Sequence, residues 1–360
     1  MVKNYLKDKG NTKEFYSGKN IFVTGCAGTI GSELIKQLIY LKPNKIIAID
    51  NNETELFFLL EQYKNHENIN FFICDVRDKE KLKFLMKGCD FVFHGAALKH
   101  VILGEYNPSD IVKTNLIGLQ NVIESAIETS VKKVLFMSSD KAVNPTNAMG
   151  ASKLMGEKLI TAANNFQNYG GTVFCSVRFG NVIGSRGSVV PIFINQLKNN
   201  LNLTITDVNM TRFLMTKEES VNLILNSLVI AQGAEIFILK MNAVKIVDLA
   251  ESIIEELAPF FNRKNVELTF IGGKPGEKLF EELLSEEEAG HSIEFKNFYC
   301  ILPAFKSIYT KSSAYKYDEK IIKEKIGNKI ASNTVGLLSK ENIKKYYIKY
   351  LKEKINEFNN

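Results

Sequence analysis

A chain of 360 residues is long enough for one large α/β domain with an added lobe, or for two domains. Its 45% hydrophobic and 24% charged residues are typical of a soluble globular protein, and no apolar run approaches the ~18–20 residues of a membrane span. The net charge of +6 comes from lysines that crowd the C-terminal end, so we expect solubility and no nucleic acid binding.

Cysteines and histidines give no sign of a disulfide framework or a metal site. The five cysteines lie mostly inside apolar runs without a C-x-x-C pair, which predicts buried thiols in a reducing compartment. The four histidines lack ligand spacing, so we expect no metal. Residues 1–19 form a polar lead that cannot serve as the apolar core of a signal peptide, and we expect a cytoplasmic protein.

The first predicted strand, residues 20–24, runs directly into a glycine-rich turn. The three glycines are Gly25, Gly28 and Gly31, and a helix is predicted over 32–41. Glycine permits the tight turn and a close approach to a pyrophosphate, while the helix N-terminus supplies N–H groups and a positive dipole end. This order predicts a dinucleotide-binding turn. An ordinary turn without a ligand is the alternative.

The second predicted strand, residues 45–49, ends in Asp50. An acid about 20 residues beyond the glycines can bind the two ribose hydroxyls of an adenosine, and it would repel a 2′-phosphate. Residues 51–53 offer no arginine to receive such a phosphate. The sequence therefore favours NAD over NADP.

The third predicted strand, residues 70–74, is followed by Asp75 and Val76. An acid and then an aliphatic side chain suit the edge and ring of an adenine. An acid that caps a helix beginning near Asp78 is the alternative.

The fourth predicted strand, 90–94, is followed by the small residues 95–97, which allow a dinucleotide to approach closely. Lys99 and His100 come just after, where open α/β sheets bind ligands. We expect His94 to be packed or bonded to a turn. Helical segments around 108–129 carry Asn115, and the alternation over 20–140 predicts a doubly wound parallel sheet.

Residues 138–153 (SSDKAVNPTNAMGASK) follow a fifth strand and run into a helix predicted over 149–165. Three neighbours, Ser139, Asp140 and Lys141, offer a hydroxyl, an acid and a base. Met149 and Lys153 are four apart and so lie on one face of the helix. A tyrosine at the first of these two positions would complete the signature of a large class of nicotinamide enzymes.

A strand at 172–179 leads into a loop, 178–188, that holds two arginines, an asparagine and several glycines, for which we expect a binding role. A helix at 191–199, a strand at 203–207 and a helix at 217–231 follow. Arg212 could pair with a diphosphate; an exposed ion pair is the alternative.

Shorter elements complete the chain. We expect strands at 235–239 and 267–271, an amphipathic helix at 243–256, and a turn at 272–279 that enters a further helix. Residues 304–360 are rich in lysine, tyrosine, asparagine and isoleucine and end in a helix at 339–357, which could dock on the chain or on a partner.

Taken together, these motifs resemble the extended short-chain dehydrogenase/reductase superfamily. Three strings, 139–147, 178–188 and 274–278, are similar to the bacterial nucleotide-sugar 4,6-dehydratases that act on N-acetylglucosamine nucleotides. The resemblance covers roughly residues 18–302. It implies a Rossmann-type NAD-binding domain over 20–190, to which part of the later chain returns, and a smaller α/β substrate-binding lobe over 191–303.

In that family, as the resemblance implies, NAD(P) oxidises the C4 hydroxyl of the sugar, a base removes the C5 proton, water leaves from C6, and the hydride returns to C6. Asp140 would act as the general acid, and Lys141 as the base if its pKa is lowered. Lys153 would bind the nicotinamide ribose. Because a thioether cannot act as a base, Met149 leaves the C4 proton to Ser139, Asp140 or a water.

The remaining implications concern ligands and partners. The implied cofactor-binding residues are Thr24, Gly25, Ala27, Gly28, Thr29, Ile30, Asp50, Asn51, Asp75, Val76, Ala96, Ala97, Lys99, Asn115, Ser138 and Lys153. The implied substrate-binding residues are Lys99, His100, Lys141, Met149, Asn181, Ser188, Val189, Arg212 and Glu277. We expect a UDP-linked sugar, with a GDP-linked sugar, a 4-epimerase or a catalytically silent dinucleotide-binding protein as alternatives, and a homo-oligomer.

Overall fold

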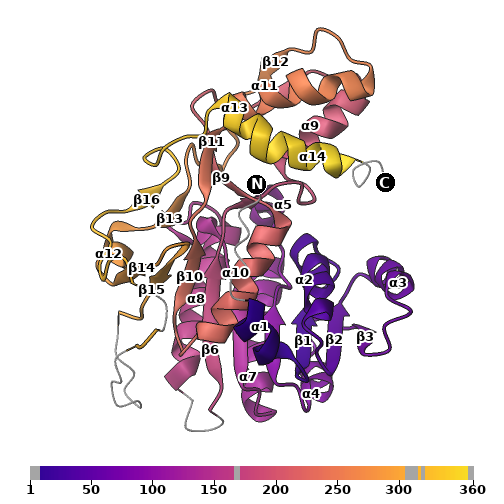
Figure 1. The fold of residues 1–360 in the computed structure, drawn as a ribbon, viewed down its shortest axis with the longest axis vertical. Helices are drawn as coiled ribbons and strands as arrows, with labels where there is room; N and C mark the ends of the chain where they lie inside the picture. The colour runs from indigo at the N-terminus through magenta and orange to yellow at the C-terminus, as the bar shows by residue number, and fades with distance from the viewer. Residues whose placement is uncertain (1–8, 166–170, 305–314, 318–320, 356–360) are drawn as a thin grey trace.

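The computed structural model describes residues 9–165, 171–304, 315–317 and 321–355 (Figure 1). Its main body is a nine-stranded sheet in the order β14-β15-β10-β6-β5-β4-β1-β2-β3. The strands are β1 (Asn20–Thr24), β2 (Lys45–Asp50), β3 (Ile69–Ile73), β4 (Phe91–His94), β5 (Lys133–Met137), β6 (Val173–Arg178), β10 (Ile236–Leu239), β14 (Ser292–Glu294) and β15 (Phe298–Ile301). Pairing is parallel from β3 to β10, and β14 and β15 add antiparallel strands at one edge.

Helices cover both faces of this sheet, which confirms the predicted doubly wound α/β fold. On one face, α2 (Thr29–Tyr40) and α10 (Lys217–Ile230) pack into a core with the strands. On the other face, α4 (Lys79–Met86), α7 (Gly118–Glu128) and α8 (Ala148–Ala163) do the same. Connections between parallel strands need such crossover helices, and their burial explains the continuous apolar strands in the sequence.

The polar lead contains a helix that the sequence analysis did not predict. It is α1 (Lys9–Tyr16), and its last residue, Tyr16, is completely buried against α10. The Tyr16 hydroxyl donates a hydrogen bond of 2.7 Å to the carbonyl oxygen of Leu225. The neighbouring aromatic residues Phe15 and Tyr16 could have indicated this helix, because aromatic side chains contribute most of the area that a short helix buries.

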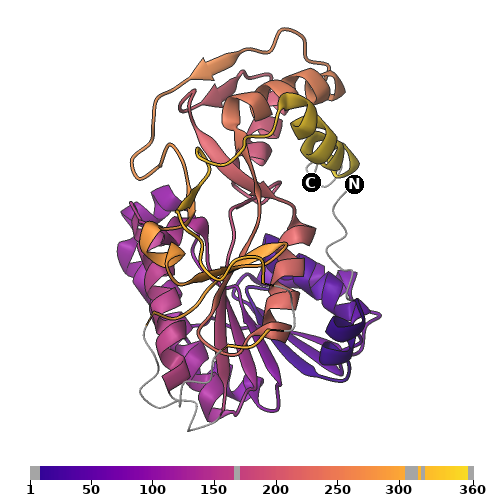
Figure 2. The ribbon, with the colours of Figure 1, turned by 60° about the vertical axis from the view of Figure 1, so that its left-hand side comes forward.

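A smaller lobe stands over the carboxyl ends of the parallel strands (Figure 2). Its strands are β7 (Asn181–Val182), β8 (Leu203–Ile205), β9 (Thr211–Met215), β11 (Asn242–Lys245) and β12 (Leu268–Phe270). Its helices include α9 (Val189–Lys198) and α11 (Ile246–Leu257). β9 and β11 pair antiparallel, so the chain is still extended at 243–245, where the sequence predicted a helix.

The chain from 272 onward also differs from the prediction. The expected helix does not begin directly after Leu279, because β13 (Glu282–Leu284) comes first and pairs with β16 (Ile330–Ala331), and only the four-residue helix α12 (Glu286–Ala289) follows. Residues 281–284 are buried on both faces, and burial of this kind favours a strand. The strand partner lies some 50 residues later, so local sequence could not reveal it.

The helix predicted at 339–357 is present as three consecutive segments, α13 (Lys340–Ile343), η5 (Lys344–Ile348) and α14 (Lys349–Glu353). The segments lie along α11 (Figure 1), and Ile343, Tyr347 and Leu351 are buried in the core of the lobe. Lys352 pairs with Glu256 of α11 at 2.6 Å. This end of the chain therefore docks on its own lobe. Across the described residues, no helix has the length and apolarity needed to cross a membrane.

Candidate active site

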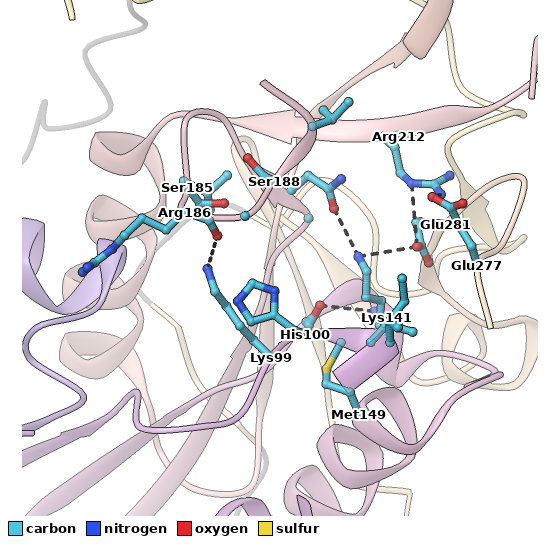
Figure 3. A pocket seen from close by; sticks show the side chains of 18 of the residues that line it. Lys99, His100, Lys141, Met149, Ser185, Arg186, Ser188, Arg212, Glu277 and Glu281 are labelled. Atoms are coloured by element: carbon cyan, nitrogen blue, oxygen red, sulfur yellow. Dashed lines mark hydrogen bonds and ion pairs between the residues drawn. The ribbon is translucent and has the colours of Figure 1, made fainter. Parts of the chain in front are cut away.

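A cavity of about 760 Å³ lies between the carboxyl ends of the parallel strands and the lobe. Figure 3 shows residues from both bodies pointing into it. The predicted residues that line it are Thr29, Ile30, Ala97, Lys99, His100, Ser138, Ser139, Lys141, Met149, Lys153, Asn181, Ser188, Val189, Arg212 and Glu277. The fold thus brings most of the predicted substrate and nicotinamide positions together.

A smaller pocket of about 140 Å³ is lined by further predicted cofactor-binding residues, which are Gly25, Asp50, Asn51, Asp75, Val76, Ala96 and Ala97. The predicted residues outside both cavities are Thr24, Ala27, Gly28, Asn115 and Asp140. The backbone N–H of Ala27 donates to the Asp50 carboxylate at 3.0 Å, which ties the glycine-rich turn to the end of β2.

The glycine-rich turn packs closely against the loop that follows β4. Gly25 has a φ of +69°, and a Cβ there would lie 2.6 Å from the backbone nitrogen of Ala96. Helix α2 begins at Thr29 without a side-chain cap, and Thr29, Ile30 and Gly31 face the larger cavity. Uncapped N–H groups at a helix N-terminus form a ready site for an anion such as a pyrophosphate.

Asp75 is held by an arginine that the sequence analysis did not consider. Arg77 donates to Asp75 through Nη2 at 2.6 Å and through Nε at 2.9 Å. The hydrogen bonds from Arg77 lower the pKa of Asp75 to about 2. Helix α4 is capped by Asp78, which accepts from the backbone N–H of Lys81. The alternative role for Asp75 as the helix cap is therefore wrong.

Thr24 and Asn115 lie outside the cavities and form hydrogen bonds to the loop that follows β4. The Thr24 hydroxyl lies 2.8 Å from Nδ1 of His94 and accepts from the backbone N–H of Ala96. Burial lowers the pKa of His94 to about 3, as expected for a packed histidine. Asn115 bonds both backbone groups of Leu98 and the Ser152 hydroxyl. It fixes the loop after β4 to the helix α8.

The acid–base residues form one connected cluster. Ser139 begins the short helix η2 (Asp140–Ala142), and its hydroxyl donates to Asp140 Oδ1 at 2.9 Å. Lys141 Nζ lies 3.0 Å from the same oxygen and 3.1 Å from the side-chain oxygen of Asn181. Asp140 is fully buried, and its second oxygen has no hydrogen-bond partner among the described residues. One carboxylate thus joins the hydroxyl to the ammonium.

Lys141 does not have the lowered pKa that a resting base needs. Burial lowers its pKa, but the charges of Asp140 and Glu281 outweigh burial and leave the pKa above its ordinary value. Glu281 Oε1 lies 3.4 Å from Lys141 Nζ. Glu281 lines the cavity but was absent from the sequence prediction (Figure 3). The string 274–278 lies close to Glu281 in the sequence, but the position of Glu281 in the fold depends on the pairing of β13 with β16.

Helix α8 presents Met149 and Lys153 to the cavity, as the four-residue spacing predicted. Lys153 Nζ donates to the carbonyl oxygen of Met137 at 2.8 Å, and burial lowers its pKa to about 8. Met149 is buried and carries no group that exchanges protons. Ser138 donates to Glu157 at 2.5 Å, so its hydroxyl is tied to the core below the cavity.

The two arginines of the 178–188 loop have different roles, which corrects the single binding role expected for them. Arg178 is completely buried and binds Glu157 and Glu288, away from the cavity. Arg186 reaches across to the glycine-rich turn, where Nη2 donates to the Ala27 carbonyl and Nη1 pairs with Glu55 at 2.7 Å. Lys99 donates to the carbonyl oxygen of Arg186 at 2.9 Å. The loop thus spans the cofactor side of the cavity.

Arg212 is neither exposed nor free. Its guanidinium donates to the carbonyl oxygens of Thr211, Lys278 and Leu279, and it lies 3.6 Å from Glu277. Because only 5% of the residue is exposed, the exposed ion pair considered from the sequence is wrong. Arg212 lines the cavity wall and holds the segment that carries Glu277 and Glu281.

Comparison with known proteins places this geometry in context. A family model described as polysaccharide biosynthesis protein matches residues 21–303. The chain is 42% identical to a UDP-N-acetylglucosamine 4,6-dehydratase (inverting) of Campylobacter jejuni over 82% of this chain and 86% of that protein. It is 40% identical to a UDP-glucose 4-epimerase of Rickettsia bellii over 79% and 82%. The solved structure of Pen from Bacillus thuringiensis is 38% identical, with a TM-score of 0.86 over 93% of this chain and 98% of that one.

Proposed function

This chain belongs to the polysaccharide biosynthesis protein family, and we propose that it removes water from a nucleotide-activated N-acetylglucosamine to give a 4-keto-6-deoxy sugar nucleotide. The observation that carries the proposal is the Asp140–Lys141 pair, of which Lys141 lines a cavity bordered by the glycine-rich turn and Asp140 is buried beside it. The names of the relatives support a nucleotide-sugar substrate. We favour UDP as the nucleotide, with GDP as the alternative.

We propose NAD as the cofactor because the residues present fit it. The uncapped N-terminus of α2 suits the pyrophosphate, and Asp50 at the end of β2 suits the ribose hydroxyls. Asp50 would repel a 2′-phosphate. Arg77, the arginine bonded to Asp75 in this pocket wall, has its guanidinium occupied by that carboxylate.

Bound NAD supplies the acceptor and donor of the hydride that leaves C4 and returns to C6. The protein supplies the proton transfers. Once C4 is a ketone, the C5 proton is acidic enough for an amine at Lys141 to remove. Asp140 is buried beside the cavity, so once protonated it passes a proton to the Ser139 hydroxyl as that hydroxyl gives its own proton to the departing C6 hydroxyl. Lys153 provides positive charge beside the sugar.

The position of Met149 requires another acceptor for the C4 hydroxyl proton. Ser139 donates to Asp140, so a proton received at the serine oxygen can pass to the carboxylate as the serine gives up its own. Asp140 would then hold the proton that the C6 hydroxyl needs. In this route the C4 hydroxyl proton, which a tyrosine would otherwise accept, becomes the proton that is given to the C6 hydroxyl. No further ionisable group is required.

The product mass distinguishes the candidate functions. We expect UDP-N-acetylglucosamine, incubated with the NAD-loaded protein, to lose one water, with GDP-N-acetylglucosamine as the parallel substrate. Solvent deuterium is expected at C5. A sugar epimer of unchanged mass would establish the epimerase instead. No conversion of either nucleotide would favour a silent dinucleotide-binding protein.

We also propose a homo-oligomer. Apolar side chains are exposed on α5 (Val101–Tyr106), the neighbouring π-helix η1 (Val112–Ile117) and α8, with Tyr106 80% and Met155 51% exposed. Exposed apolar residues that cluster in this way mark association surfaces. Sedimentation is expected to give a multiple of the 40.6 kDa chain mass, and Tyr106→Asp with Met155→Asp is expected to shift the protein to single chains. A wild-type protein that sediments as single chains would contradict the proposal.

A further inference from the structure

Glu281 is a buried carboxyl group in the cavity wall, beside Lys141 and Arg212. Its backbone is fixed on both sides, because its N–H donates to Ser332 Oγ at 3.0 Å and its carbonyl accepts from the N–H of Ser332 at 2.8 Å. The side chain points toward Lys141 (Figure 3) and is 3% exposed. Its Oε2 has no hydrogen-bond partner among the described residues. A purely structural carboxylate would be expected to satisfy both oxygens.

Lys141 therefore lies between two carboxyl groups, Asp140 at 3.0 Å and Glu281 at 3.4 Å. Other groups around the pair are Asn181 of β7, Arg212 of β9, 3.9 Å from Glu281, and Glu277 and Lys278 of the preceding loop. Lys278 donates to the carbonyl oxygen of Val143. Burial and the charge of Asp140 raise the pKa of Glu281, the charges of Lys141 and Arg212 lower it, and the net effect is a raised pKa.

In the proposed reaction, Asp140 cannot also accept the proton that Lys141 must lose. Asp140 must receive the C4 proton and deliver it to the C6 hydroxyl. It is therefore not available to hold the proton that Lys141 must lose before it can act as a base. A second acceptor within reach of Nζ resolves this conflict, and Glu281 is the group in that place.

We propose that Glu281 is the proton acceptor of Lys141, so that the base at C5 is the Lys141–Glu281 pair. The inference rests on the proposed dehydration. One N–H bond of the ammonium breaks, an O–H bond forms at Glu281 Oε1, and the net charge of the pair is unchanged. The freed lone pair on Nζ takes the C5 proton, and the C5–H bonding electrons pass to the enolate. Nζ later returns one of its protons, which exchange with solvent, to C5. Glu281 acts through Lys141 and is a positioning residue.

The test is the pH dependence of turnover in the NAD-loaded protein. Wild-type kcat is expected to be flat across the neutral range, because the proton moves within the pair. In Glu281→Gln the proton must leave to solvent, so kcat at neutral pH is expected to fall about 10²-fold and to recover as pH rises. Acid-quenched samples should accumulate the 4-keto sugar that still carries its C6 hydroxyl. Glu281→Asp keeps an acceptor and is expected to keep the flat profile.

Bound NAD and the KM for the sugar nucleotide are expected to be unchanged in Glu281→Gln. The inference would be overturned if Glu281→Gln had the same kcat as the wild type at neutral pH, or if its kcat were lower by the same factor at every pH. If the variant does not fold, an acid limb in the wild-type kcat profile at the ionisation of a lysine would overturn it instead. Failure of the dehydration itself would differ from these results, because the wild type would then release no water from either sugar nucleotide.

Discussion

Asp140→Asn and Lys141→Ala are each expected to abolish water loss, with kcat lowered by about 10²–10⁴-fold. Asparagine keeps the shape of Asp140 and can still bond Ser139, but it cannot carry a proton to the C6 hydroxyl. Alanine removes the amine that takes the C5 proton. Both residues lie outside the smaller pocket that holds Asp50 and outside the glycine-rich turn, so the amount of bound NAD should not change. Product mass and the absorbance of the released cofactor measure the two effects separately.

Lys132→Ala is the matched control for the lysine variant. Lys132 also pairs with an aspartate, Asp90, at 2.7 Å, but it lies at the opposite end of the sheet, just before β5. Its turnover should equal that of the wild type. Full activity in either site variant would remove that residue from the mechanism. Loss of bound NAD together with activity would show instead that the change disturbed the cofactor site.

The parallel-sheet half of the molecule could be predicted from sequence because its signals are local. The glycine-rich turn, Asp50 and the 138–153 segment each follow a strand directly. The carboxyl ends of neighbouring parallel strands meet at one edge, so residues found separately in the sequence were expected to converge. Lys99, His100, Lys141 and Met149 do line one cavity.

The later half depended on pairings between distant segments. β11 is a strand because β9 lies beside it, and β13 is a strand because β16 does. An apolar stretch with some helical periodicity, such as residues 243–256, does not reveal such a partner. Glu281 was missed for the same reason, because its approach to Lys141 follows from the pairing of β13.

The two arginines of the 178–188 loop show a different limit. The composition of the loop predicted a binding role, but it did not distinguish a buried ion pair from a ligand contact. Arg178 is the last residue of β6 and points inward, whereas Arg186 lies on the exposed loop. Because β6 ends at Arg178, the guanidinium of Arg178 lies in the core and that of Arg186 lies on the loop beyond the strand.

Arg178→Met is expected to lower the free energy of unfolding by about 3–5 kcal/mol. The guanidinium donates two hydrogen bonds to Glu157, two to Glu288 and one to the carbonyl oxygen of Leu283. Methionine fills a similar volume but leaves Glu157, itself 1% exposed, as a buried charge without its cation. Urea unfolding of the cofactor-free protein measures the change.

Arg77→Met is the matched control, because Arg77 Nη2 also lies 2.6 Å from its carboxylate partner but its side chain is 47% exposed. An exposed pair contributes at most about 1 kcal/mol, so this variant should stay close to the wild type. Adding Glu157→Gln and Glu288→Gln to Arg178→Met should recover part of the loss, because the unpaired charges are then gone. Equal stability of the Arg178 and Arg77 variants would show that the buried cluster does not stabilise the fold.

The pH dependence of unfolding tests the same cluster by titration. Burial opposes the ionisation of Glu288, but the charge of Arg178 outweighs it and holds the pKa of Glu288 below its ordinary value. A carboxyl group with a lowered folded-state pKa stabilises the fold above its unfolded-state pKa, and this contribution is lost as pH falls through the folded-state pKa. The wild type should therefore lose more stability on acidification than Arg178→Met. Parallel acid curves for the two proteins would mean that Arg178 does not set the ionisation of Glu288.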